Sequence, residues 1–169
     1  MLIMTRLILI TSLLFGSLFI NSCGFKSISY IENEVGEDME ARLASIVIKK
    51  SSGAKNQLLR TEIFNILNPA NVKEEQRYLL VVKPSERQSP TFITSTGSSG
   101  RMLLEVNLSY SLTQIATTKR ISSGNLYASE SYNIENNRYG NYNAKEFARK
   151  TVYRSLAEKL RNEIIQDFD

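Results

Sequence analysis

Few side chains in this sequence could carry out catalytic chemistry. The 169 residues include no His and one Cys, Cys23. Histidine is the commonest general base near neutral pH and the commonest transition-metal ligand. Without it, a Ser-His-Asp or Cys-His catalytic site cannot form, and a zinc site lacks its usual ligands. We therefore expect a protein that is not an enzyme and holds no metal.

Two carboxylates, Glu105 and Glu130, remain as candidates for acid–base hydrolysis. They fall on neighbouring predicted strands and would have to meet in a pocket to act together. Solvated charges on a strand surface are the simpler interpretation, so hydrolysis is the least favoured function.

Cys23 follows a segment typical of a secretion signal. Arg6 precedes an uncharged apolar run from 7 to 20, which is shorter than the roughly 20 residues of a membrane-spanning helix. The sequence Ile20-Asn21-Ser22-Cys23 resembles a bacterial lipobox. We expect removal of residues 1–22 as a signal peptide. Cys23 would then carry diacylglycerol and an N-linked acyl chain such as palmitate, with no other cofactor, since two or more chains anchor a protein stably.

The expected mature chain starts at Cys23. Residues 23–44 have little periodicity and predict a lipidated tether, whereas 45–169 have the size of one domain. The residue after Cys23 is Gly24, not an acidic residue of the kind that retains lipoproteins at the inner membrane. We therefore expect the protein at the periplasmic face of the outer membrane.

The composition is 42% hydrophobic and 22% charged with a net charge of +4. This balance is typical of a folded protein, and its anionic partner there would be lipid, lipopolysaccharide or cell wall rather than nucleic acid.

The first half of the mature chain predicts a strand, a helix and a second strand. A β-branched strand covers 46–48, and apolar residues at helical spacing follow from 55 to 67. The apolar run 78–82 predicts a strand covered on both faces. The polar, proline-containing stretch 84–100 is expected to be a mobile loop, with a polar extension of the preceding strand as the alternative.

The second half predicts a long hairpin and a long helix. Apolar and polar residues alternate from 101 to 114 and return from 120 to 134, around a turn at 116–119. Asn143 is placed as an N-cap, with Glu146 completing a capping box. The helix would run from 144 to 168 with an apolar stripe on one side. The opposite, charged side would carry the basic residues, Arg149 among them.

These elements predict an α+β fold in the order β-α-β-β-β-α. It would be a two-layer sandwich in which two helices pack on one face of a four-stranded mixed sheet. The first crossover makes its two strands parallel, and the last three strands form a meander. The second face of the sheet would be open to water or to a partner.

Residue patterns along nearly the whole chain resemble the LPS-assembly lipoprotein family (LptE type), especially its alphaproteobacterial branch. The patterns are Cys23-Gly24-Phe25, the helix at 58–67, the strand at 78–82, the strand from Arg101 to Ser109-Tyr110-Ser111-Leu112, its partner ending in Ser131-Tyr132-Asn133, a tyrosine at Tyr139 or Tyr142, and the long C-terminal helix.

The resemblance implies an outer-membrane lipoprotein that plugs and helps assemble the β-barrel that inserts lipopolysaccharide into the outer leaflet. The partners would be that barrel protein, lipopolysaccharide itself and the membrane. Arg101, Lys119 and Arg120 are the candidate phosphate contacts, with ordinary charges at hairpin ends as the simpler alternative. The alternative function is a periplasmic adaptor lipoprotein that activates or scaffolds another envelope complex, such as a cell-wall synthase.

Overall fold

The computed structural model describes residues 32–93 and 99–168. The expected signal peptide and Cys23 lie outside the described residues. Residues 36–169 form one compact unit, which contains the whole sheet. Within the described part of the chain, no helix combines the length and the apolar character needed to cross a membrane.

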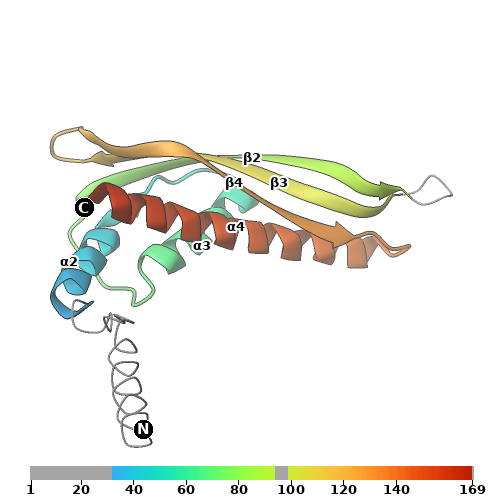
Figure 1. Cartoon of the computed structure of the whole chain (residues 1–169), viewed down its shortest axis with the longest axis horizontal. Helices are drawn as coiled ribbons and strands as arrows, with labels where there is room; N and C mark the ends of the chain where they lie inside the picture. The colour runs from blue at the N-terminus through green and yellow to red at the C-terminus, as the bar shows by residue number, and fades with distance from the viewer. Residues whose placement is uncertain (1–31, 94–98, 169) are drawn as a thin grey trace, which may run out of the picture. The chain divides into compact units, whose positions relative to one another are not determined.

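A four-stranded sheet has the strand order β1-β2-β3-β4. Figure 1 shows its long strands β2, β3 and β4 above helices α3 and α4. β1 (Ile46–Ile48) lies parallel to β2 (Tyr78–Ile93). β2, β3 (Ser99–Gln114) and β4 (Arg120–Asn133) form an antiparallel meander. The mixed sheet, its parallel pair and the β3–β4 hairpin are confirmed.

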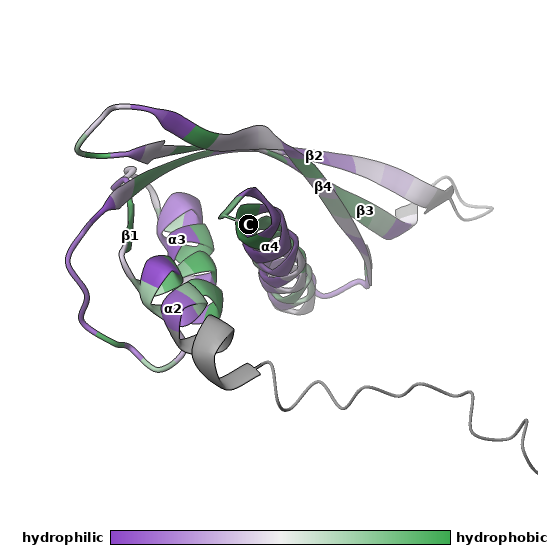
Figure 2. Cartoon of the chain, turned by 60° about the vertical axis from the view of Figure 1, so that its left-hand side comes forward, coloured by the Kyte–Doolittle hydropathy of each residue, from purple (hydrophilic) through white to green (hydrophobic). Residues whose placement is uncertain are grey.

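Helices α3 (Ala54–Leu67) and α4 (Arg138–Phe168) cover one face of this sheet (Figure 2). The predicted α+β sandwich with two helices on one face is therefore confirmed. A further helix, α2 (Glu32–Ala44), occupies the second half of the range expected to be a tether. Its Leu43 is only 2% exposed and belongs to the core, so the packed region begins before the predicted boundary at residue 45.

The hydrophobic core lies between the sheet and the two covering helices. Every second residue of the central part of β3 faces it, and these side chains are buried: Leu104, Val106, Leu108, Tyr110 and Leu112. Fully burying an apolar side chain of this size stabilises the fold by about 1.5–3 kcal/mol. A register shift of one residue would expose the whole row, so the alternation determines which face of β3 meets the helices.

β2 is much longer than predicted. The expectation of a mobile loop is wrong for residues 84–93, which continue the strand and pair with β3. β1 pairs only with residues 78–80, so the rest of β2 is an edge strand. Pro84 and Pro90 fit there because an edge strand tolerates proline. Residues 94–98 lie outside the described part of the chain.

α4 begins six residues before the predicted start, at Arg138 rather than 144. Asn137 provides the cap, because its Oδ1 accepts hydrogen bonds from the backbone N–H groups of Tyr139 at 3.0 Å and Gly140 at 3.2 Å. The predicted capping box at Asn143 is therefore wrong. With 31 residues, the helix spans roughly 46 Å.

Candidate functional site

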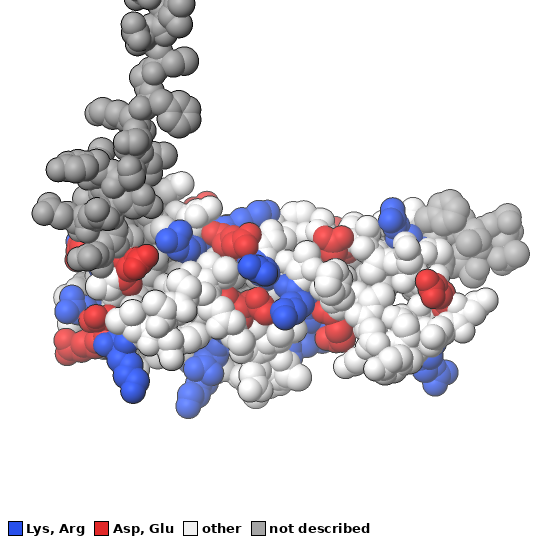
Figure 3. Space-filling model, turned by 90° about the horizontal axis from the view of Figure 1, so that it is seen from below, with Lys and Arg blue, Asp and Glu red and all other residues white. Residues whose placement is uncertain are grey.

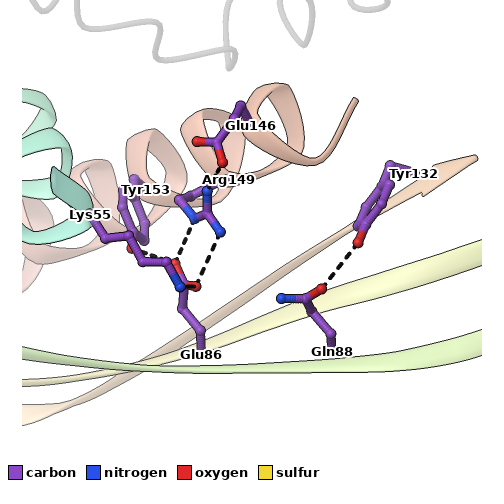
Figure 4. A network of polar contacts seen from close by, with 7 residues as sticks. All are labelled: Lys55, Glu86, Gln88, Tyr132, Glu146, Arg149 and Tyr153. Carbon is purple, nitrogen blue, oxygen red and sulfur yellow. Dashed lines mark hydrogen bonds and ion pairs between the residues drawn. The ribbon is translucent and has the colours of Figure 1, made fainter. Parts of the chain in front are cut away.

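Glu86 is the centre of a polar network between the sheet and the helices (Figure 4). It lies on β2, and its side chain is only 10% exposed. Its carboxylate accepts hydrogen bonds from the Tyr153 hydroxyl at 2.5 Å and from Arg149 Nε at 2.9 Å. Lys55 Nζ adds an ion pair at 2.6 Å. The network therefore connects β2 with both α3 and α4.

Arg149 is the buried cation of this network. Its side chain is 3% exposed and also forms an ion pair with Glu146, one turn earlier on α4. The prediction that Arg149 lies on the exposed side of the helix is wrong. α4 crosses the sheet where β2 presents Glu86 in place of an apolar residue, so a cation is needed at that point. The position of Glu86 could have been inferred from the alternation of β2. Glu86 lies an even number of residues after the buried Leu80, so both side chains point to the same face of the strand.

The contacts determine the protonation states of the network. Burial raises the pKa of Glu86, but the hydrogen bonds from Lys55, Tyr153 and Arg149 outweigh this effect and lower the pKa from 4.5 to about 2. Burial and the nearby Glu86 carboxylate raise the pKa of Tyr153. Glu86 is therefore ionised at neutral pH and holds no proton to donate. We interpret the network as a structural clamp that fixes the helices on the sheet.

None of the described helices covers the other face of the sheet (Figure 2). We call it the open face; its positions on β2, β3 and β4 alternate with the core residues. Hydroxyl and amide side chains dominate it: Ser85, Ser89, Asn107, Ser109, Ser111, Thr113, Ser123, Asn125, Ser129, Ser131 and Asn133. Some of these groups bond across strands, as Ser109 Oγ does with Asn125 Oδ1 at 2.6 Å.

Charge on the open face is mostly positive. Four basic residues occupy its strand positions: Lys83, Arg87, Arg101 and Arg120. Glu105 is the one acidic residue at these positions in the described strands, and its carboxylate accepts hydrogen bonds from the Tyr127 hydroxyl at 3.1 Å and Ser89 Oγ at 3.4 Å. On the helix side, acidic and basic side chains are interspersed (Figure 3). The open face is thus the part of the domain suited to an anionic, hydroxyl-bearing ligand.

The three predicted phosphate contacts do not form one cluster. Arg101 lies at one end of β3, where its Nε donates to Asn133 Oδ1 at 3.3 Å. Lys119 and Arg120 lie at the opposite end, in and beside the β3–β4 turn. The strand between Arg101 and Thr113, the residue that pairs with Arg120, extends roughly 40 Å.

Lys83 and Arg87 lie on β2 between these two ends and are not among the predicted contacts. Both belong to the segment that was expected to be a loop or its boundary, so their shared face could not be recognised. Their separation of four residues is even, which in a strand places both side chains on the same face. Extending the alternation of β2 past Pro84 would have found them.

Glu105 and Glu130 do not form the facing pair that hydrolysis would require. Their partners across the β3–β4 ladder are Ser129 and Leu104, respectively. Leu104 belongs to the core, so Glu130 is on the helix-covered side while Glu105 is on the open face. The sheet therefore separates the two carboxylates.

Comparisons with known proteins concern the fold. No family model and no curated protein matches the sequence. A solved structure of a candidate lipoprotein from Caulobacter crescentus matches with a TM-score of 0.64 at 18% identity, covering 76% of this chain and 93% of that one. The Minor Lipoprotein of Acinetobacter baumannii matches with a TM-score of 0.52 at 19% identity, covering 70% and 87%.

A third solved structure, rare lipoprotein B from Shewanella oneidensis, has a TM-score of 0.48 at 11% identity, covering 73% of this chain and 90% of that one. The first two matches show that the chain shares its fold with proteins described as lipoproteins.

Proposed function

We propose that the chain is a lipid-anchored protein at the periplasmic face of the outer membrane. There it plugs and helps assemble the β-barrel that inserts lipopolysaccharide, and it contacts lipopolysaccharide through its open face. The observation that carries this proposal is the open face itself, a long sheet surface with hydroxyl, amide and basic side chains. The residue patterns of the sequence and the fold shared with two lipoproteins support it.

The chemistry of the open face fits a phosphorylated glycolipid. Guanidinium groups bind phosphate in a bidentate manner, and lysine ammonium groups bind it as point charges. Hydroxyl and amide side chains between the cations can exchange hydrogen bonds with sugar hydroxyls. The proposed contacts are the predicted Arg101, Lys119 and Arg120, together with Lys83 and Arg87 from the structure.

The lipid anchor is part of the proposal. Two or more acyl chains on Cys23 would keep the domain at the membrane, where a barrel embedded in the same bilayer can enclose it. Mass spectrometry of the N-terminal peptide should find Cys23 at the mature N-terminus, with the mass of a diacylglycerol and an N-linked acyl chain. An intact signal segment or an unmodified thiol would contradict this part of the proposal.

Purification from detergent-extracted membranes tests the partner. We expect a large outer-membrane β-barrel protein to co-purify, and depletion of the chain should lower surface lipopolysaccharide and leave that barrel misassembled. Recovery of a cell-wall synthase in its place would support the adaptor function. Normal surface lipopolysaccharide and a correctly assembled barrel after depletion would overturn the proposal.

A further inference from the structure

The first turns of α4, the orange part of this helix in Figure 1, carry three exposed aromatic side chains. Tyr139 and Phe147 are each 74% exposed, and Tyr142 is 62% exposed. At 3.6 residues per turn, Tyr142 and Phe147 lie about 60° and 80° to either side of Tyr139. We call these three residues the aromatic patch; it occupies the side of the helix that points away from the core.

Packing within the domain does not account for the aromatic patch. α4 is held on the sheet by other residues, beginning with Ala148 and Val152, which are buried. Among the described residues of α4, the exposed large hydrophobic side chains are confined to 138–147. A cluster of exposed apolar side chains, in contrast to scattered single ones, marks a contact surface.

The charge around the aromatic patch is positive. Residues 138–150 of α4 contain four basic residues and one acidic residue, Glu146. Glu146 is paired with the buried Arg149, which leaves Arg138, Lys145 and Lys150 as the excess. Residues 151–168 contain three basic and three acidic residues and so carry no excess. The aromatic half of the helix is therefore also its cationic half.

We propose that the aromatic patch docks onto an anionic phospholipid surface. Helices that lie at the membrane interface combine aromatic or apolar side chains with Lys and Arg, and anionic lipids attract them. The Phe147 ring would enter the boundary between headgroups and acyl chains. Tyr139 and Tyr142 can place their rings beside it and their hydroxyls among the headgroups. The contact goes beyond the proposed function, because it requires neither lipopolysaccharide nor a barrel.

Tryptophan fluorescence gives a specific test, because the sequence contains no Trp. The full chain carrying Phe147→Trp, isolated from membranes, is mixed with vesicles whose acyl chains are brominated, with or without phosphatidylglycerol. In anionic vesicles the indole should lose about half of its fluorescence or more, since an interfacial helix buries its apolar side by about 5–10 Å. In zwitterionic vesicles the loss should be much smaller.

Phe64→Trp is the matched control. Phe64 is an exposed aromatic residue on α3, at 40% exposure, and should be quenched little in either kind of vesicle. Adding Tyr139→Ser and Tyr142→Ser to Phe147→Trp should reduce the quenching about two-fold, as expected when apolar contact area is removed. Circular dichroism confirms that each variant is folded.

Equal quenching at the two indole positions would overturn the inference, as would quenching that is independent of anionic lipid. Shielding of the Phe147→Trp indole only when a co-purified membrane protein is bound would also overturn it, since the occupant would then be a protein. These outcomes leave the proposed function untouched, because co-purification of a barrel is measured separately.

Discussion

The two faces of the sheet are made from the same strands, yet they carry opposite kinds of side chain. On the covered face, β3 contributes fully buried apolar residues such as Leu104 and Leu108, and one charged network joins the sheet to the helices. On the open face, most of the intervening residues are hydroxyls, amides and cations. Since alternate residues of a strand point to opposite faces, one strand can encode stability on one side and recognition on the other. Substitutions on the two faces should therefore have separable effects.

The largest expected effect on stability is on the covered face, at Arg149. Replacing it by Met leaves the Glu86 carboxylate buried without its nearest guanidinium, and loss of one partner of a buried ion pair costs about 3–5 kcal/mol. Denaturant unfolding of Arg149→Met measures this cost. Arg154→Met is the control, since the exposed Arg154–Glu158 pair, at 3.6 Å, should contribute about 0.5 kcal/mol or less. An equal loss of stability in the two variants would contradict the interpretation of the Glu86 network as a structural clamp.

Two neighbouring leucines of β3 test the contrast between the faces directly. Leu104→Ala should cost about 2–5 kcal/mol, because Leu104 is fully buried and the change leaves a cavity. Leu103→Ala, on the open face and only partly buried, should cost about 1 kcal/mol. Unfolding curves of both variants make the comparison. Equal costs would mean that the open face is packed in the native protein.

Lowering the pH should reduce the stability of the fold through protonation of Glu86, on the covered face. Its pKa of about 2 in the folded chain lies below the ordinary value of 4.5, so the stabilisation is fully present above pH 4.5 and is lost as the pH falls toward 2. The loss amounts to roughly 3 kcal/mol. The free energy of unfolding, followed from pH 5 downward, should fall less steeply in Glu86→Gln. The same pH dependence of the free energy of unfolding in the two proteins would contradict the assignment of this effect to Glu86.

Changes to the open face should affect stability least. Lys83→Ser with Arg87→Ser removes two exposed cations and should change the free energy of unfolding by less than about 1 kcal/mol. The same variant should bind lipopolysaccharide more weakly, with a smaller dependence on salt, because the lost contacts are electrostatic. Arg60→Ser with Arg154→Ser, which removes two cations from the helices, should leave binding unchanged. Equal losses in both variants would indicate only a response to net charge.

The sequence predicts an element correctly where the residue pattern is local and regular. The alternation from Arg101 to Gln114 predicted β3 and its hairpin, because period two is maintained over the whole strand. The extension of β2 was missed, since Pro84, Pro90 and polar neighbours obscure its alternation. The start of α4 was missed because Asn137 caps a turn whose aromatic residues are exposed and add nothing to the apolar stripe.

The polar network could not be predicted from the sequence for a different reason. Glu86 and Arg149 are 63 residues apart, and nothing in either local pattern identifies the other as its partner. A charged residue within a predicted loop and a basic residue on an amphipathic helix both have a simpler solvated interpretation. The open-face cations Lys83 and Arg87 were missed with the same strand. The polar network and the open-face cations can therefore be recognised only when the full length of β2 is known.

The proposed function requires that the open face contacts lipopolysaccharide. A photoreactive residue placed in living cells at Asn107, in the middle of that face, tests this contact, with Gln57 on the exposed side of α3 as the control. We predict a lipopolysaccharide adduct at Asn107 and little or none at Gln57. An adduct of equal yield at Gln57, or no adduct at Asn107 in cells that export lipopolysaccharide normally, would contradict the account.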